Sequence, residues 1–306
     1  MSLLNRPSHG YHSSLVVIYK LLLMEQNLPK DRIIALCAPA SLYEKEDKNT
    51  RKHIGNTLRT WIKLGLFVES KDGISINPEV SKGDLTLERL PSVARSTVLK
   101  RENNANFFDK EDSGSADFTR LLAWSLMQDI WEYDQTSDVV VSLRLDKQTK
   151  DDDVFKQNDT RWSGFKAWTQ FLGFAWSPRY PNSKIEPDPT SAIIDVLPKT
   201  FEAGSTVEAP ELIQKLADAI PVLDGGEYRI QVEKRLGETS GEYSWRPLPP
   251  HQISTTLSRS LMRLRENGLL DFVRKDDSKQ LFRCLTGRDR RPIGDVSHFT
   301  LNFKNL

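Results

Sequence analysis

The sequence predicts a mainly helical fold with small β-hairpins, which is an α+β class. Apolar residues recur at helical spacing in most of the longer apolar segments. Three glycines, Gly65, Gly173 and Gly268, each stand where such a helical pattern ends and a strand-like pattern begins. These glycines are 108 and 95 residues apart, which is the size of a small domain with its linker. We therefore expect three equivalent units in tandem.

The first expected unit, residues 1–82, begins with three helices. The stretch HSSLVVIYKLLLMEQ starts with two serines that can cap a helix, and its apolar residues follow at helical spacing. LPKDRIIALCAP is a shorter helix bounded by prolines, and TRKHIGNTLRTWIKLG is the third helix. In the third helix Ile54, Leu58 and Trp61 share one side. Gly65 ends it in the left-handed conformation that only glycine adopts without strain.

A hairpin follows the third helix. In LFVESKDGISINP, the strand-like residues 66–68 and 74–76 flank Lys71-Asp72-Gly73, and Asp-Gly is a strong hairpin signal. Three helices followed by a hairpin is the order of a winged helix, a helix-turn-helix with a β-hairpin appended. The sequence therefore predicts tandem winged helix-turn-helix domains.

The second expected copy spans residues 116–190, after a helix and polar linker at 83–115. DFTRLLAWSLMQDIWEY is a strongly amphipathic helix. DVVVSLRL has strand character unless it forms the second helix of the copy, and TRWSGFKAWTQFLG takes the place of the third helix. FAWSPRYPNSKIEPDP would be the wing, although its prolines make it a poor strand.

The third expected copy spans residues 191–306. After the apolar segment SAIIDVLP comes the helix TVEAPELIQKLADAIP, and EYRIQVEKRLG is a strand or a short helix. LPPHQISTTLSRSLMRLRENG is the third helix of this copy. LLDFVRKDDSKQLFRCL then predicts a hairpin around Asp276-Asp277-Ser278, and HFTLNF alternates as a last strand.

The composition predicts a soluble globular protein with no membrane segment. The chain has 306 residues, of which 38% are hydrophobic and 28% charged, with a formal net charge of +1. The apolar run 15–24 is interrupted by Lys20 and is about half the length that a bilayer needs. Cys37 and Cys284 are far apart in the sequence and form no CxxC motif, so we expect no disulfide and no cysteine-rich zinc site. This use of cysteine is typical of a protein in the reducing cytoplasm.

The sequence predicts no enzyme, no cofactor and no metal. It contains no Walker loop, GxGxxG, GxSxG, HExxH or EF-hand motif. His9 and His12 lack a carboxylate or cysteine at ligand spacing, and Asp151-Asp152-Asp153 is interpreted as a solvated charge run. Ser297 beside His298 indicates nothing without geometry. A hidden nuclease or hydrolase is the third functional hypothesis, with no candidate residue.

The polar faces of the expected third helices carry the main functional signal. In a winged helix that binds DNA, the third helix lies in the major groove and the wing touches an adjacent groove or the backbone. Basic side chains contact phosphates, while Arg and Asn read base edges. The candidate DNA-contacting residues are Arg51, Lys52, Asn56, Arg59 and Lys71 in the first copy, and Thr255, Ser258, Arg259, Arg263, Arg274, Lys275 and Lys279 in the third, with Arg288, Arg290 and Arg291 behind its hairpin.

Charge is segregated along the chain. Residues 251–291 hold ten Lys and Arg against five Asp and Glu, and residues 1–80 hold eleven against eight. Because the total is close to neutral, the remaining residues are acidic. This pattern suits DNA contact at the two ends and protein contact in the centre. Exposed cations are also often merely solvated, and winged helices also serve as protein-docking modules, so a scaffold stays an alternative.

Aromatic residues cluster in the second copy. Trp162, Trp168 and Trp176 lie among Phe165, Phe171 and Phe174. Such a cluster can stack on unpaired bases. Its helical spacing favours a buried core instead.

The N-terminal stretch MSLLNRPSHGYHSSLVVIYKLLL has an extended leader, Asn5-Arg6-Pro7-Ser8, that runs into an apolar helix. In this stretch, in its length and in its general plan, the chain resembles proteins of bacterial DNA-modification and phage-defence gene clusters. The nearest is the DpdG family of the 7-deazaguanine-in-DNA system. The resemblance implies a non-catalytic subunit of a DNA-modification or restriction complex in a bacterial cytoplasm, and it carries over no active-site residue.

Together these observations predict a non-catalytic tandem winged-helix protein that binds double-stranded DNA and has protein partners in a larger complex for DNA modification or antiviral defence. The alternative is a winged-helix adaptor or scaffold with little DNA affinity of its own, resembling the partners of chromosome-organising ATPases. The near-zero net charge favours the adaptor, and the segregation of charge favours DNA binding.

Overall fold

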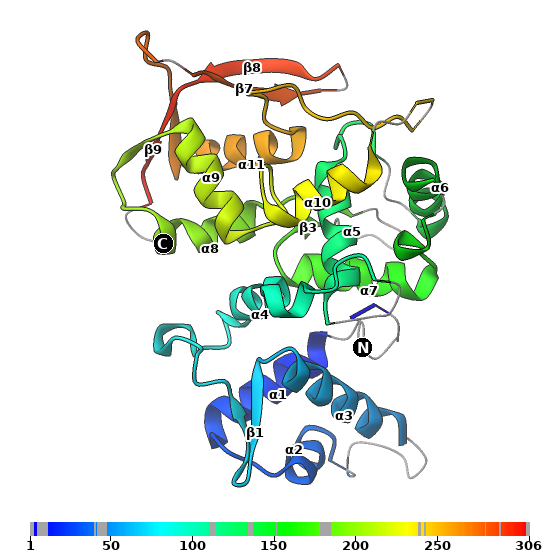
Figure 1. Cartoon of the computed structure of the whole chain (residues 1–306). Coiled ribbons are helices and arrows are strands. Elements are labelled where there is room, and N and C mark those ends of the chain that lie inside the picture. The colour runs from blue at the N-terminus through cyan, green and yellow to red at the C-terminus, as the bar shows by residue number, and fades with distance from the viewer. Residues whose placement is uncertain are drawn as a thin grey trace. The chain divides into compact units, whose positions relative to one another are not determined.

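A computed structural model describes the chain as two compact units, each mainly helical (Figure 1). The first unit comprises residues 1–118 and 159–172, and the second comprises 119–158 and 173–306. The residues that the structure describes are 3–4, 12–39, 41, 48–109, 114–133, 137–150, 152–177, 185–237, 240–241, 243–278, 280–287 and 289–303.

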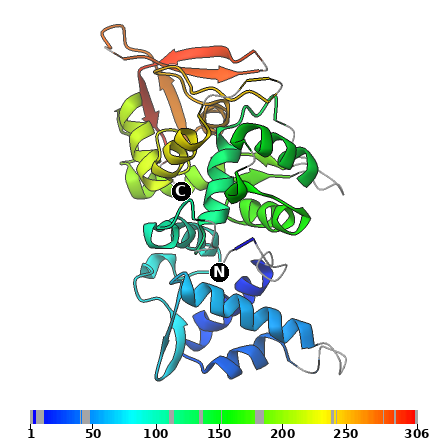
Figure 2. The same cartoon turned by 45° about the vertical axis from the view of Figure 1, so that its right-hand side comes forward.

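The first unit contains the predicted three helices and hairpin. The helices are α1 (His12–Glu25), α2 (Lys30–Cys37) and α3 (Lys48–Lys63). The strands β1 (Phe67–Ser70) and β2 (Gly73–Ile76) pair antiparallel beside these helices (Figure 2). Helix α3 packs on α1, and its residues Ile54, Leu58 and Trp61 are at most 4% exposed. Burial of apolar surface therefore holds the group together.

A third segment completes the small sheet. Leu28, in the connection between α1 and α2, exchanges backbone hydrogen bonds with Ile74 of β2 at 3.1 and 2.8 Å. Gly73 lies directly against this connection, because a Cβ built on it would meet the Leu28 backbone at 2.8 Å. Its φ of +132° also disfavours any residue with a side chain. The Asp-Gly pair that predicts the hairpin therefore also permits this close approach.

The three aligned glycines have the conformation that the sequence predicts. Gly65, Gly173 and Gly268 have φ values of +84°, +80° and +70°, and each lies between a helix and a strand. At Gly65 and Gly268, two successive N–H groups bond back to the last helical carbonyls in the same pattern. This is the glycine-dependent helix end that satisfies otherwise unpaired carbonyl groups.

Further helices complete the first unit around an aromatic core. Trp61 of α3 lies 5.5 Å from Trp168, and Trp162 stacks on Phe165 at 5.3 Å, measured between ring centroids. Trp162, Phe165 and Trp168 are at most 1% exposed, so the predicted core is confirmed for them. The helical segments are η3 (Lys82–Asp84), α4 (Leu90–Leu99), η4 (Arg101–Asn104), the start of α5 (Ala116–Met127) and α7 (Asp159–Phe171).

The second unit resolves the alternatives that the sequence left open. DVVVSLRL is helical, as is EYRIQVEKRL, and the apolar segment SAIIDVLP also lies in a helix. Its helices are the rest of α5, α6 (Asp138–Thr149), η5 (Asp153–Phe155), α8 (Thr190–Thr200), α9 (Ala209–Ala219), α10 (Glu227–Leu236) and α11 (Thr255–Glu266). Its strands are β3 (Ala175–Trp176), β4 (Glu186–Pro187), β5 (Thr206–Glu208), β6 (Leu270–Val273), β7 (Phe282–Thr286), β8 (Arg291–Val296) and β9 (His298–Leu301).

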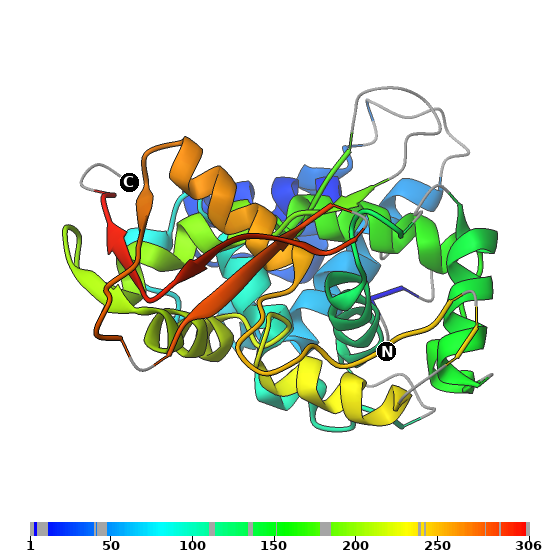
Figure 3. The same cartoon turned by 90° about the horizontal axis from the view of Figure 1, so that it is seen from above.

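The predicted hairpin around Asp276 is wrong in its pairing. Strand β6 pairs with β9, which pairs in turn with β5, while β7 pairs with β8 in a separate twisted ribbon (Figure 3). The predicted last strand is confirmed. The physical reason is side-chain register, because β9 places Phe299 opposite Phe272 and Leu301 opposite Leu270.

The two units divide the chain differently from the predicted ranges 1–82, 83–115, 116–190 and 191–306, which stay a prediction. Helix α7 belongs to the first unit, while the two-residue ladder of β3 and β4 after it belongs to the second.

Both cysteines are free thiols, and burial raises the pKa of Cys37 to about 11 and that of Cys284 to about 12. None of the described helices is both long and apolar enough to cross a bilayer.

Several predicted features lie outside the described residues. They are the leader 5–8, His9, part of the charged connector at 42–47, part of the polar linker at 112–113, Asp151, the middle of the proline-rich wing at 178–184, Lys279 and Arg288.

Candidate nucleic-acid interface

Helix α3 carries a polar stripe on the side opposite its core residues. Lys52, Asn56, Arg59 and Lys63 follow one another at intervals of four, three and four residues, which brings them onto one face of a helix. The three cations are exposed and Asn56 is half-buried. The Nη1 group of Arg59 donates to the Asn56 Oδ1 atom at 3.3 Å, so the two side chains lie together on the stripe.

Arg51 and Lys71 lie outside this stripe. Arg51 is exposed, and its Nε group donates to the carbonyl oxygen of Ala38, at the end of α2, at 3.3 Å. Lys71 is exposed in the hairpin turn. The hydroxyl of Ser70 fixes this turn by donating to the Gly73 carbonyl at 3.1 Å and accepting from the Asp72 N–H at 3.2 Å. The structure therefore gives Lys71 a rigid support beside a neighbouring carboxylate, Asp72.

Lys63 is a cation of the stripe that the sequence candidates did not include. Its signal was available, because it continues the spacing of Lys52, Asn56 and Arg59 by one further turn. It also lies in the last turn of α3, where a cation is favourable toward the unpaired carbonyl groups. The stripe thus presents three cations and one amide over about three turns.

Helix α11 has a different surface at the equivalent positions. When Gly268 is aligned with Gly65, the places of the four stripe residues are taken by Thr255, Arg259, Met262 and Glu266. Here one cation and one carboxylate replace three cations. Helix α11 therefore lacks the concentrated positive charge that α3 presents.

The sequence predicted that Thr255 and Ser258 face solvent, but both side chains are buried. Thr255 is 4% exposed, and its hydroxyl donates to Asp129 at 3.3 Å. Ser258 is fully buried, and its hydroxyl donates to the Ile253 carbonyl at 3.2 Å and accepts from the Leu285 N–H at 3.0 Å. Both hydroxyls are used within the second unit because segments distant in sequence pack on this face of α11.

The arginines of α11 are paired inside the same unit. Arg259 donates to a Glu186 carboxylate oxygen at 2.8 Å, and Arg263 forms an ion pair with Asp188. These carboxylates belong to β4 and the residue after it. The predicted DNA-facing arginines are therefore neutralised by acidic residues that precede them by more than seventy positions.

The other basic candidates of the second unit lie at separate places and do not form one stripe. Arg274 and Lys275 are exposed in the segment after β6. The Nε group of Arg290 binds Asp129 at 3.0 Å, and Arg291 pairs with Asp289 at 2.9 Å. Paired arginines offer fewer donors and less net charge to a phosphate.

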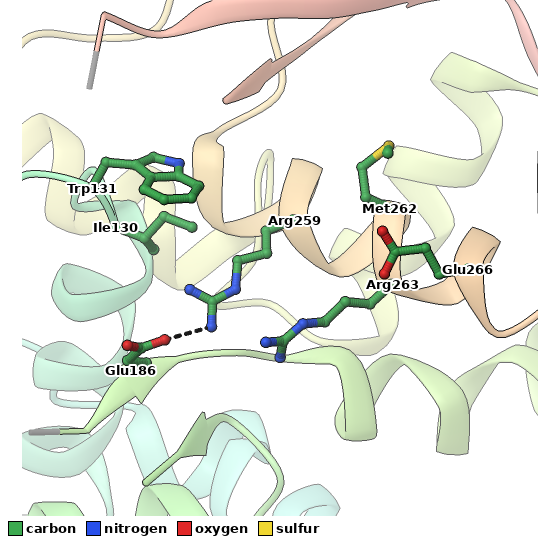
Figure 4. Close-up of a pocket in the computed structure, with 7 residues that line it drawn as sticks. All are labelled: Ile130, Trp131, Glu186, Arg259, Met262, Arg263 and Glu266. Carbon is green, nitrogen blue, oxygen red and sulfur yellow. Dashed lines mark hydrogen bonds and ion pairs between the residues drawn. The ribbon is translucent and has the colours of Figure 1, made fainter. Parts of the chain in front are cut away.

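A cleft of about 530 Å³ lies beside α11 in the second unit (Figure 4). One wall is formed by the turn after α5, where the Trp131 side chain is 46% exposed. No sequence pattern identified Trp131 or Glu266 as site residues, because the cleft forms only when the turn, β4 and α11 meet. The residues that line the cleft are Ile130, Trp131, Glu186, Arg259, Met262, Arg263 and Glu266.

The Ser297 hydroxyl, next to His298, is engaged in hydrogen bonds with the backbone, which is a structural role. Ser297 is 2% exposed, and its hydroxyl donates to the Val273 carbonyl at 3.1 Å and accepts from the Lys275 N–H at 2.8 Å. The hydroxyl lies 2.9 Å from the His298 Nδ1 atom. Within the described part of the chain, no group of three or more His, Cys, Asp or Glu side chains is arranged to hold a metal ion.

Comparison with known proteins gives one match. The model of the DpdG-like family matches residues 1–278, which is most of the chain. No curated protein and no solved structure matches it. The match agrees with the resemblance of the N-terminal stretch and connects the chain with DNA modification and defence. The chain belongs to the DpdG-like family.

Proposed function

We propose that this protein is a non-catalytic DNA-recognition subunit of a bacterial DNA-modification or phage-defence complex. In this proposal the first unit is a winged helix that binds double-stranded DNA through α3 and the β1–β2 hairpin. The single observation that carries the proposal is the exposed stripe of Lys52, Asn56, Arg59 and Lys63 on α3.

The order of elements supports this use of α3. Three packed helices followed by an antiparallel hairpin is the arrangement in which the third helix enters the major groove and the wing contacts a neighbouring groove. The core side of α3 is buried on α1, so the opposite stripe is the side available to a partner. Lys71, at the turn of the hairpin, is where a wing contact with a phosphate would form.

The stripe suits a mechanism in two parts. Lys52 and Lys63 at its two ends bind phosphates and set the register of the helix on the duplex. Asn56 and Arg59 in the middle reach base edges, because Asn pairs with adenine and Arg with guanine in the major groove. The formal net charge of +1 means that the attraction is local to this stripe and not a property of the whole surface.

The second unit has a different role in this proposal. We infer a second winged helix from α9, α10 and α11 with β6 and β9. Because Arg259 and Arg263 are paired with carboxylates, this copy contributes contacts within the protein and toward partners. Membership of the DpdG-like family supports a setting with several protein components, in the cytoplasm where the DNA is.

Gel-shift titration of random duplex DNA with the full chain, over a salt series, tests the proposal. Replacing Lys52, Arg59 and Lys63 together by Ala should weaken binding by about tenfold or more and reduce the slope of log K against log salt by about two to three. The matched control removes three exposed cations of the same unit that lie off the stripe, Lys20, Lys30 and Lys82. Equal losses in the two triple variants, or no binding by the native chain, would refute duplex recognition by α3.

A protein adaptor is the second candidate, and a specific observation favours it. Val139 and Leu143 are 61% and 49% exposed on one face of α6. Adjacent exposed apolar side chains are a feature of docking surfaces. An adaptor would show no duplex binding even at low salt but would purify from its native host in a stable complex, and Leu143→Asp would dissociate that complex.

A further inference from the structure

We propose that the cleft of the second unit binds a single unpaired base that carries an exocyclic amino group, held against Trp131. This inference goes beyond duplex recognition by α3 and does not depend on it. The two sites use different residues in different units, so each can be tested with the other intact.

Trp131 offers an exposed aromatic surface on a hydrogen-bonded turn. Its side chain is 46% exposed, although burial of an indole is strongly favourable. Its backbone N–H donates to Asp129 at 3.0 Å, and the Ile130 N–H donates to the Thr255 hydroxyl at 3.3 Å. Thr255 and Arg290 also donate to the Asp129 carboxylate. The backbone that carries Trp131 is therefore tied to α11, and its half-exposed indole stands at the wall of the cleft.

A second exposed indole lies near the same place. Trp176 of β3 is 51% exposed and is the direct partner of Glu186 across the two-residue ladder. Directly opposed residues in an antiparallel pair point to the same side and are close neighbours. Because Glu186 also lines the cleft, its neighbour Trp176 offers a second aromatic surface, on which an adjacent base can stack.

The opposite side of the cleft presents both donors and acceptors. Arg259 and Arg263 project from α11 toward Glu186 and β4 in Figure 4, with Glu266 one turn further along the helix. Each guanidinium has five N–H groups, of which the ion pairs to Glu186 and Asp188 use only part. Glu266 is exposed and makes no ion pair with any residue that the structure describes. The lining of the cleft therefore combines two guanidinium groups and two carboxylates with the indole.

This combination favours a base over a phosphate. The cleft and its immediate support contain two arginines and three carboxylates, Glu186, Asp188 and Glu266, so the local charge does not attract an anion. Carboxylates accept hydrogen bonds from the amino groups of cytosine and adenine, whereas thymine offers no amino group. Stacking on an aromatic side chain contributes about 1–3 kcal/mol per base.

The base must be unpaired to enter. In a duplex, the bases are stacked on one another, so an indole cannot stack on a base face and the cleft cannot enclose a base without extrusion of the nucleotide. The cleft volume of about 530 Å³ lies in the range of small-molecule sites, roughly 300–1,000 Å³, and can enclose one base. The cleft would therefore recognise single-stranded, gapped or extruded nucleotides.

Fluorescence anisotropy of short labelled single-stranded DNA, titrated with the full chain, tests the proposal. We expect oligo-dC and oligo-dA to bind about fivefold or more tightly than oligo-dT of equal length, because only the first two have amino groups. Trp131→Ala should lower the oligo-dC affinity about fivefold or more, and Trp131→Phe should retain most of it, because the ring still stacks. Glu266→Gln should reduce the preference for dC over dT.

Two control variants distinguish the cleft from the α3 stripe and from the rest of the second unit. Ile230→Ala removes an exposed apolar side chain of the same unit and should change nothing. The triple α3 variant should keep the preference for oligo-dC, so failure of duplex binding and failure of the cleft are distinguishable. Competition by oligo-rC and by free cytidine monophosphate shows whether the ligand is a DNA strand, an RNA strand or a nucleotide.

Two results would overturn the proposal. One is equal affinity for oligo-dC and oligo-dT. The other is undiminished oligo-dC binding by Trp131→Ala, with circular dichroism melting showing that the variant is folded.

Discussion

Arg259 of α11 donates a hydrogen bond to Glu186 of β4 at 2.8 Å, and its side chain is only 19% exposed. The helix that the sequence predicts to read DNA in the third copy thus directs its central arginine into its own unit. The equivalent position on α3 holds Asn56, which lies between exposed cations on an open face. The two third helices are alike in their glycine ends and different in what surrounds their polar faces.

Arg259→Ala should leave duplex binding unchanged within about twofold, because its guanidinium is paired and partly covered. Arg59→Ala should weaken binding by about 1 kcal/mol or more, because its guanidinium lies on the exposed stripe. Gel-shift titration at one low salt concentration compares the two. An equal loss in both variants would mean that α11 reaches the duplex after all.

Gly73→Ala should destabilise the first unit by about 1–3 kcal/mol, because the new Cβ would meet the Leu28 backbone at 2.8 Å and φ is +132°. Urea unfolding of the full chain measures the loss. Gly83→Ala is the matched control, because its nearest neighbour would be the Ser81 Oγ atom at 3.9 Å. We expect that change to be neutral or to stabilise by about 0.4–1 kcal/mol. A harmless Gly73→Ala would contradict the close approach.

Asp224→Asn should lower the free energy of unfolding of the second unit by about 3 kcal/mol, because the buried guanidinium of Arg229 would lose a negatively charged partner. The Asp224 carboxylate pairs with Arg229, which is 2% exposed, and accepts from the Ser254 N–H and hydroxyl at 2.7 Å each, at the start of α11. Glu233→Gln, which changes the more exposed partner of the same arginine, should cost clearly less. Thermal melting of both variants gives the comparison, and equal losses would argue against a special role for Asp224.

His12 should make the first unit less stable in mild acid. Burial lowers the pKa of His12 below its ordinary value of 6.5, and its ring stacks on Phe171 with centroids 4.8 Å apart. The unfolded chain therefore binds a proton at a pH where the folded chain does not. The contribution of neutral His12 to the free energy of unfolding is present above about pH 6.5 and is lost as the pH falls. Urea unfolding at several pH values between about 5 and 7.5 checks this, and His12→Phe should flatten the dependence. A stability that rose on acidification in the native chain but not in His12→Phe would reverse the sign.

Local features of the fold could be predicted from the sequence. The helices around Leu58 and Leu257, the hairpin at Asp72-Gly73 and the last strand at Phe299 depend on spacing and turn chemistry among near neighbours. The exposed stripe of α3 follows from the same spacing. The aromatic core also followed from it, except that Trp176 is half-exposed.

The partners of the polar faces and the pairing of the distal strands could not be predicted in this way. Arg290 meets Asp129 across 161 positions, and β6 pairs with β9 and not with the nearer β7. A run of exposed-looking polar residues has many possible partners at such distances, and only packing selects among them. The sequence by itself therefore determined helices such as α3 and α11, the glycine ends and the first hairpin, because neighbours in the chain encode them. The tertiary structure alone decided that the face of α11 is covered and that a cleft opens beside Trp131, because both depend on which distant segments exclude water together.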